Sequence, residues 1–306
     1  MVNTHPRDLQ SILPSTIETY NAWVSSHNIA HTVDFLEADD STRLLWIGPR
    51  KAKYVVLFFH GGGYAMPLSK GHLDWMAHVR NEAINAGVEL SLLTHNGDLI
   101  PENRYPRQMS QGILALEHLL NSGYEPSQVT MVYIKLTTCG SNIVVGGDSA
   151  GGHLSLSLIA HLHHPRFEDC PTRNLLSQSG AVRGCFLVSP LASFNFNTPS
   201  YNRWLSADVL RGFRRKRLGV ALDVPESWWN GFDAVDRVLV TGGSEEVFSD
   251  HIQRLAQMLK RKSNGNVTLY MGNEAHDGPL MDFLAGKLPS QTTKTITEFV
   301  ISCFRK

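Results

Sequence analysis

The apolar run at 143–145 passes through Gly-Asp-Ser-Ala-Gly at 147–151 directly into a helical pattern over 150–163. This order predicts a β-strand, a sharp turn and an α-helix. Such a turn forces its central serine into a strained backbone conformation that presents the hydroxyl at the edge of a sheet. The flanking glycines suit the turn because side chains there would collide with the backbone. Ser149 is therefore the predicted nucleophile, and an ordinary glycine-rich turn is the alternative.

Short apolar segments alternate with longer helical patterns over most of the chain. The predicted strands are 43–47, 54–59, 88–93, 142–145, 184–188, 237–240 and 267–271, and the predicted helices lie near 71–86, 107–121, 150–163, 250–262 and 291–304. Strands that are apolar along their whole length suit a sheet buried on both sides. The pattern predicts an α/β fold with a mostly parallel central sheet and helices on both faces.

Two segments depart from this alternation. The first, about 1–30, has helical patterning before the first predicted strand, and the second, 190–232, is rich in aromatic residues and includes a helical stretch near 206–218. We expect both to pack above the sheet as a helical cap. Because the chain contains no internal repeat and no low-complexity linker, we predict a single domain over 1–306.

Composition argues against several classes of partner. Lysine plus arginine number 28, as do aspartate plus glutamate, so the formal net charge of +0 provides no attraction to nucleic acid or anionic membranes. The N-terminal sequence MVNTHPRDLQ lacks the apolar core of a signal peptide, and no apolar run approaches the roughly 20 residues of a membrane span. The expected partner is a small molecule, and a homodimer is left open.

The cysteines are far apart and form no CxxC pair, which favours free thiols in a reducing compartment; they are Cys139, Cys170, Cys185 and Cys303. We therefore expect a cytoplasmic protein.

Three histidines lie at a helix end without acid or cysteine partners at ligand spacing, so no metal is predicted there; they are His161, His163 and His164.

The motif His-Gly-Gly-Gly-Tyr at 60–64 directly follows the predicted strand 54–59. Consecutive glycines let backbone N–H groups approach a substrate closely, and such donors stabilise a developing oxyanion. We predict an oxyanion hole formed by the N–H groups of Gly62, Gly63 and Ala150. His60 is expected to support the loop, and a plain flexible turn is the alternative reading of the motif.

A nucleophilic serine requires a base, and the base requires an orienting carboxylate. The chain has 14 histidines, so chain order must select among them. A loop with three acids, Glu245, Glu246 and Asp250, follows the predicted strand 237–240, and His276 follows the strand 267–271. The carboxyl ends of parallel strands share one edge of the sheet, and the order serine, acid, histidine suits a strand–turn–helix serine site. His276 is the predicted base.

Through HGGGY, GDSAGG at 147–152, the carboxylate loop and the late histidine, the sequence resembles the hormone-sensitive-lipase-type branch of the α/β hydrolases. Within that branch it is most similar to esterases and lipases encoded near fungal secondary-metabolite genes, and PENRYP at 101–106 and WW at 228–229 add to the likeness. The resemblance covers nearly the whole chain. It implies an α/β-hydrolase fold, hydrolysis of small apolar carboxylic esters, and no metal or organic cofactor.

The acid loop of that family commonly reads Asp-Pro-Leu-x-Asp, with its first aspartate catalytic. Laid on residues 246–250, this register puts Glu246 in the acid position. Asp250 and Glu245 are the runners-up, and Asp250 is also a candidate cap for the following helix. Asp277, beside His276, is interpreted as a loop residue rather than the orienting acid.

The sequence departs from the family at two places: the segment 129–140 resembles an insertion, and 94–98 replaces a strand end that more often carries tyrosine. Three alternatives to ester hydrolysis stay open. The same acyl-enzyme could serve a transferase, cyclase or amidase, the fold could serve as a non-catalytic ligand-binding protein, and the basic run 211–217 could belong to an interaction surface.

Overall fold

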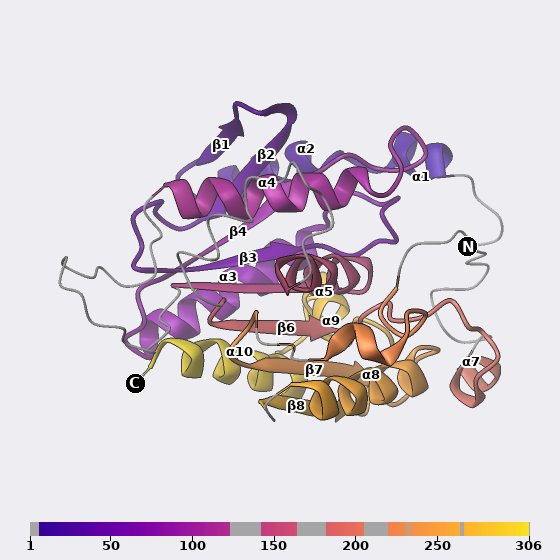
Figure 1. Cartoon of the computed structure of the whole chain (residues 1–306). Helices are drawn as coiled ribbons and strands as arrows, with labels where there is room; N and C mark the ends of the chain where they lie inside the picture. The colour runs from indigo at the N-terminus through magenta and orange to yellow at the C-terminus, as the bar shows by residue number, and fades with distance from the viewer. Residues whose placement is uncertain are drawn as a thin grey trace.

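The computed structural model describes residues 6–122, 142–163, 182–204, 220–230, 232, 234–263 and 266–305. The expected cap helix near 206–218, the segment 129–140, the basic run 211–217 and His164 lie outside these residues. The described part is built on an eight-stranded sheet with helices on both sides (Figure 1).

The strand order across the sheet is β1-β2-β4-β3-β5-β6-β7-β8. The strands are β1 Val33–Leu36, β2 Asp39–Ile47, β3 Tyr54–Phe59, β4 Leu90–Asn96, β5 Ile143–Asp148, β6 Gly184–Val188, β7 Val238–Gly243 and β8 Val267–Gly272. The pairings β1–β2 and β2–β4 are antiparallel and the remaining pairings are parallel. The predicted mostly parallel sheet is confirmed. The strand β1 was not predicted, because it is short and becomes recognisable only by its pairing with β2.

Two helical layers cover the sheet. The described helices are α1 Pro6–Ile12, α2 Thr16–Ser26, α3 Lys70–Asn85, α4 Arg107–Asn121, α5 Ala150–His163, α7 Pro199–Trp204, η1 Glu226–Trp229, α8 Ser249–Lys262, α9 Gly278–Leu284 and α10 Gln291–Phe304. Val55, Leu57 and Phe59 of β3 pack with α4, α5 and α8, while Val56 and Phe58 pack with α2, α3, α9 and α10. The period of two along each strand thus fills two separate cores.

The helix α2 belongs to one of these side layers. Ser15 and Glu18 form a capping box at its start, which sets where the helix begins. Tyr20 and Trp23 are buried in the same core as α3, and the Trp23 indole donates to Asp74 of α3 at 2.7 Å. The helix α2 therefore packs beside α3 in the layer on one side of the sheet.

The helix α1 lies at the carboxyl ends of the parallel strands. The Gln10 side-chain amide donates to the carbonyl of Ala65 at 2.7 Å and to that of Ile100 at 2.8 Å. These carbonyls belong to the loops that follow β3 and β4. No residue of α1 is buried, so polar contacts hold this helix in place.

The aromatic segment contributes to both core and surface. Trp229 and Phe232 are buried in the core that contains α8, while Phe194, Phe196 and Tyr201 are only partly buried against it. The segment is fastened to the loop before α8, since the Ser200 hydroxyl donates to the carbonyl of Val247 at 2.8 Å.

Two further expectations concern the chain as a whole. Within the described ranges, no helix is long and apolar enough to cross a bilayer. Cys185 and Cys303 are buried free thiols, and burial raises the pKa of each. Cys139 and Cys170 lie outside the described residues.

Candidate active site

Ser149 occupies the sharp turn between β5 and α5. Its φ of 50° lies in the left-handed region, and its backbone N–H donates to the carbonyl of Val188 at 2.8 Å. A Cβ at Gly151 would lie 1.9 Å from the carbonyl oxygen of Phe59. The turn therefore requires glycine there, because the elbow packs directly against the end of β3.

The structure brings together Ser149 and His276, which chain order indicated, and Glu246, which the resemblance placed in the acid position. The Nε2 atom of His276 lies 3.0 Å from the Ser149 hydroxyl oxygen, and Nδ1 lies 2.5 Å from Oε2 of Glu246. The three residues follow the carboxyl ends of β5, β7 and β8 respectively. All three are buried, with Ser149 5 % exposed and Glu246 fully inaccessible. A continuous chain of contacts therefore runs from a hydroxyl through an imidazole to a carboxylate.

Glu246 is fixed at both carboxylate oxygens. While Oε2 contacts His276, Oε1 accepts a hydrogen bond from the N–H of Gly243 at 2.9 Å. The ring of Phe248 meets the His276 imidazole edge-on, with centroids 5.3 Å apart. These contacts leave the imidazole little freedom to rotate away from Ser149.

The alternative acids lie elsewhere. Oδ2 of Asp250 accepts a hydrogen bond from the N–H of Ser200 at 2.7 Å, at the start of α7. The helix α8 begins at Ser249 with Phe248 as its N-cap, so Asp250 lies inside the first turn and the expected capping role was wrong. The side chain of Glu245 is exposed.

The loop after β3 has a left-handed run. Gly62, Gly63 and Tyr64 have φ values of 91°, 63° and 61°. The carbonyl of Gly62 accepts hydrogen bonds from the N–H groups of Ala65 and Met66, each at 3.0 Å, which closes a tight turn. Ala150, the third predicted donor, is the buried first residue of α5.

Asp148 fastens this loop to the nucleophile strand. Its Oδ1 accepts from the N–H of Gly61 at 2.9 Å, and its Oδ2 lies 3.3 Å from Nε2 of His72 on α3. Burial and the neighbouring His72 lower the pKa of His60 to about 4, so His60 is neutral at ordinary pH. The Nδ1 atom of His60 lies 2.9 Å from the carbonyl oxygen of Gly61, which fits the supporting role expected for it.

Two contacts at the site were not predicted from the sequence. The Tyr64 hydroxyl lies 2.5 Å from Nδ1 of His153 on α5. The Oδ2 atom of Asp277 lies 3.1 Å from Nε2 of His276, in an ion-pair contact. For Asp277 the available signal was its position directly after His276. Asp277 precedes α9 and does not contact Nδ1, where Glu246 lies, but the contact of its carboxylate with Nε2 was not anticipated, since backbone direction decides whether adjacent side chains meet.

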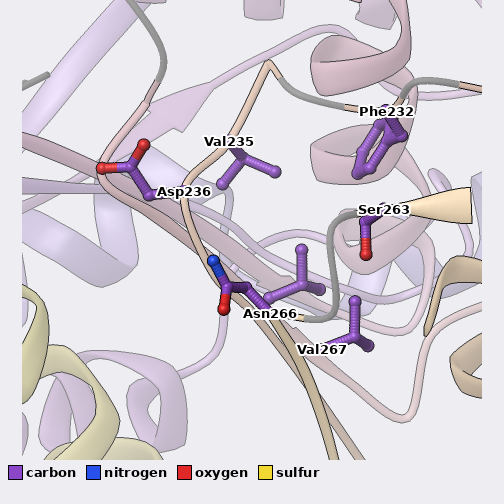
Figure 2. A pocket seen from close by; sticks show the side chains of 7 residues that line it. Phe232, Val235, Asp236, Ser263, Asn266 and Val267 are labelled. Carbon is purple, nitrogen blue, oxygen red and sulfur yellow. The ribbon is translucent and has the colours of Figure 1, made fainter. Parts of the chain in front are cut away.

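A cavity of about 150 Å³ lies away from this site. Figure 2 shows its lining residues, which include Val238 and Val267 at the amino ends of β7 and β8. Ser149, Glu246 and His276 follow the opposite ends of their strands, so the cavity does not belong to their site. In the part of the chain that the structure describes, no group of three or more metal-ligating side chains occurs.

The fold and the site together define a class of protein. The sheet order, the serine elbow after β5, and the acid and histidine after β7 and β8 are the arrangement of an α/β hydrolase. Residues 56–277 match the family described as the alpha/beta hydrolase fold, and the chain belongs to this family.

Individual relatives are more distant. A steryl acetyl hydrolase from Saccharomyces cerevisiae is 25% identical over 119 residues, which span 39% of this chain and 24% of the relative. A thermostable esterase from Pseudomonas putida is 17% identical, with 98% of this chain and 88% of that chain covered at a TM-score of 0.66. An esterase of the bacterial hormone-sensitive lipase family is 18% identical, with 98% and 96% covered at a TM-score of 0.65. At such identities the solved structures support the fold.

Proposed function

We propose that this protein is a serine hydrolase that cleaves a small, largely apolar carboxylic ester through Ser149, His276 and Glu246. The observation that carries the proposal is the contact chain at 3.0 Å and 2.5 Å from the Ser149 hydroxyl through the His276 imidazole to Glu246. A buried carboxylate on Nδ1 fixes the tautomer whose Nε2 accepts a proton from serine.

In the first step, Nε2 of His276 takes the hydroxyl proton as Ser149 Oγ attacks the ester carbonyl carbon. The carbonyl oxygen becomes an oxyanion, and the N–H groups of Gly62, Gly63 and Ala150 donate to it. Each such donor contributes about a hundredfold or more in rate. Glu246 stabilises the imidazolium, which then protonates the departing alcohol and leaves an acyl-enzyme on Ser149.

In the second step, His276 takes a proton from water, and the resulting hydroxide attacks the acyl carbonyl. Collapse of this second tetrahedral intermediate releases the carboxylic acid, and His276 returns the proton to Ser149 Oγ. The cycle consumes one water molecule and regenerates the free enzyme.

The acyl group is proposed to be short. The yeast relative is named as a steryl acetyl hydrolase, and the solved structures reported above are named as esterases. An acetyl ester of a largely apolar alcohol is therefore the first substrate class to test, even though the yeast match covers only a quarter of that relative.

The test compares hydrolysis of p-nitrophenyl acetate, butyrate and octanoate by wild type and Ser149→Ala. We expect wild type to hydrolyse acetate fastest and the variant to lose several orders of magnitude in turnover. A fluorophosphonate probe should label Ser149 in wild type alone. Retained turnover in folded Ser149→Ala would contradict the assignment of the nucleophile, and fastest hydrolysis of octanoate would contradict the short acyl group.

A further inference from the structure

The base nitrogen of the site has two oxygen neighbours at almost the same distance. The Nε2 atom of His276 lies 3.0 Å from Oγ of Ser149 and 3.1 Å from Oδ2 of Asp277. Because Nδ1 already contacts Glu246, the imidazole lies between two carboxylates. The mechanism proposed above uses only one of these carboxylates.

The backbone holds Asp277 in this position. Its φ of 54° is left-handed, and it is the residue directly before α9, whose first turn contains Pro279. Its N–H donates to the Ser189 hydroxyl oxygen at 3.2 Å. The residue is 7 % exposed, and among the described residues Oδ1 has no hydrogen-bond partner. The carboxylate is therefore little solvated, and the imidazole is its main source of stabilisation.

Further ionisable groups surround the pair. Asp148 and Ser149 approach from the end of β5, Glu246 from the loop after β7, and His72 from α3, where it pairs with Asp148. Glu274 lies in the same loop as His276, with a pKa raised by burial. Among these groups the acids outnumber the histidines, so the region has an excess of buried negative charge when every carboxyl is ionised.

This environment favours keeping one proton between His276 and Asp277. Burial lowers the pKa of His276, but Asp277 and Glu246 outweigh burial and raise it well above its ordinary value. Burial also raises the pKa of the Asp277 carboxyl, and Asp148 and Glu246 add to this effect. Loss of the shared proton leaves two buried carboxylates beside a neutral imidazole, which is unfavourable in a region of low polarity.

We propose that Asp277 is a positioning residue that holds this proton on the Nε2 side of His276 and thereby keeps the base from accepting the proton of Ser149. The inference rests on the proposed function of the site. When the proton is on Nε2, it occupies the lone pair directly. When it is on Oδ2, the Asp277 hydroxyl donates to that same lone pair.

The base becomes available only when the shared proton leaves to solvent. The site then contains a neutral imidazole whose Nε2 lone pair faces Ser149, together with an ionised Asp277. Activity should therefore rise with pH, with a midpoint that belongs to the pair of residues and lies above the value of an isolated imidazole. Asp277 would therefore restrict the activity of the hydrolase to pH values above this midpoint.

The experiment measures the pH dependence of kcat/KM for p-nitrophenyl acetate in wild type and Asp277→Asn. Asparagine is tolerated in the left-handed conformation of residue 277, is nearly isosteric with aspartate, and removes both the negative charge and the titratable proton. We expect the midpoint to fall by about one unit or more, as the removal of a nearby charge does. On the acidic side of both midpoints kcat/KM should then rise about tenfold or more. Asp282→Asn on α9 makes the same change in net charge away from His276 and should keep the wild-type midpoint.

A second measurement separates this inference from the proposed function. The 15N resonances of the His276 imidazole report its protonation in wild type and Asp277→Asn, whether or not any ester is cleaved. A lower midpoint in the variant, with no probe labelling of Ser149 in either protein, would support the shared proton and reject the hydrolase.

Equal imidazole midpoints in wild type and Asp277→Asn would overturn the inference even if Ser149 proves to be the nucleophile. If Asp277→Asn does not fold, Asp277→Gly serves instead, because glycine also suits a φ of 54°. The same fall in midpoint is expected for Asp277→Gly, and an unchanged midpoint would again overturn the inference.

Discussion

The hydroxyl of Tyr64 lies 2.5 Å from Nδ1 of His153, which joins the loop after β3 to the helix that follows Ser149. Nε2 of the same histidine lies 3.3 Å from the Ser157 hydroxyl, one turn further along α5. Tyr64 directly follows Gly62 and Gly63 and shares their left-handed backbone conformation. This contact therefore ties the loop that carries the proposed oxyanion donors to the helix that follows the nucleophile.

We expect Tyr64→Phe to lower kcat about fivefold, because a single hydrogen bond of roughly 1 kcal/mol is lost where it positions the oxyanion loop. KM for p-nitrophenyl acetate should change little, since the phenyl ring preserves the packing. Steady-state kinetics measure both parameters. An unchanged kcat would show that the turn is held by its own backbone hydrogen bonds.

The strained backbone at Ser149 should be visible as a difference between two inactive variants. Both Ser149→Ala and Ser149→Gly remove the hydroxyl, but only glycine adopts a φ of 50° without strain. We expect Ser149→Gly to be more stable than Ser149→Ala by about 1 kcal/mol in urea unfolding. Equal stabilities would indicate that the elbow stores no measurable strain.

The identity of the acid is tested by two isosteric variants. Glu246→Gln should reduce kcat by about four orders of magnitude, because the amide no longer stabilises the imidazolium or selects its tautomer. Asp250→Asn serves as its control, since Asp250 contacts the N–H of Ser200 and is expected to retain most of its turnover. The reverse ranking would transfer the acid role to Asp250.

His95 should make the fold sensitive to acid. It is buried at the end of β4, neither ring nitrogen has a hydrogen-bond partner among the described residues, and burial and His60 lower its pKa to about 3. Because the folded pKa is below the unfolded value, the unfolded state binds more protons between these values. The associated stability is present above pH 6.5 and is lost as the pH falls toward 3.

Between pH 7.5 and pH 5, His95 should cost wild type about 2 kcal/mol in its free energy of unfolding, and His95→Leu should not show this loss. Urea unfolding of both proteins at the two pH values measures the difference. Thr94→Val replaces a neighbouring buried polar group that has no titratable proton, so its difference from wild type should be the same at both pH values. A gain of the same size in both variants would mean that His95 does not carry the acid sensitivity.

Local sequence was sufficient for much of the fold. The period of two in β3 separates the two cores, and the Ser15–Glu18 capping box marks the start of α2. These features could be predicted because they depend on residues close together in the chain. The strand β1 and the helix α9 could not, since both are short: β1 is defined by its pairing with β2, and α9 packs in a core with residues distant in sequence.

At the site, the sequence by itself determined which serine and histidine to consider, because the order of strands fixes which loops share an edge. The choice of Glu246 among the acids of its loop came from the resemblance to the family's acid loop. Only the tertiary structure decided that Asp277 contacts Nε2 of His276 and that Asp250 binds the start of α7 instead. The physical reason is that a contact depends on backbone direction at each residue. The left-handed conformation at 277 turns its carboxylate back onto the imidazole, and the identities of the neighbouring residues do not predict that direction.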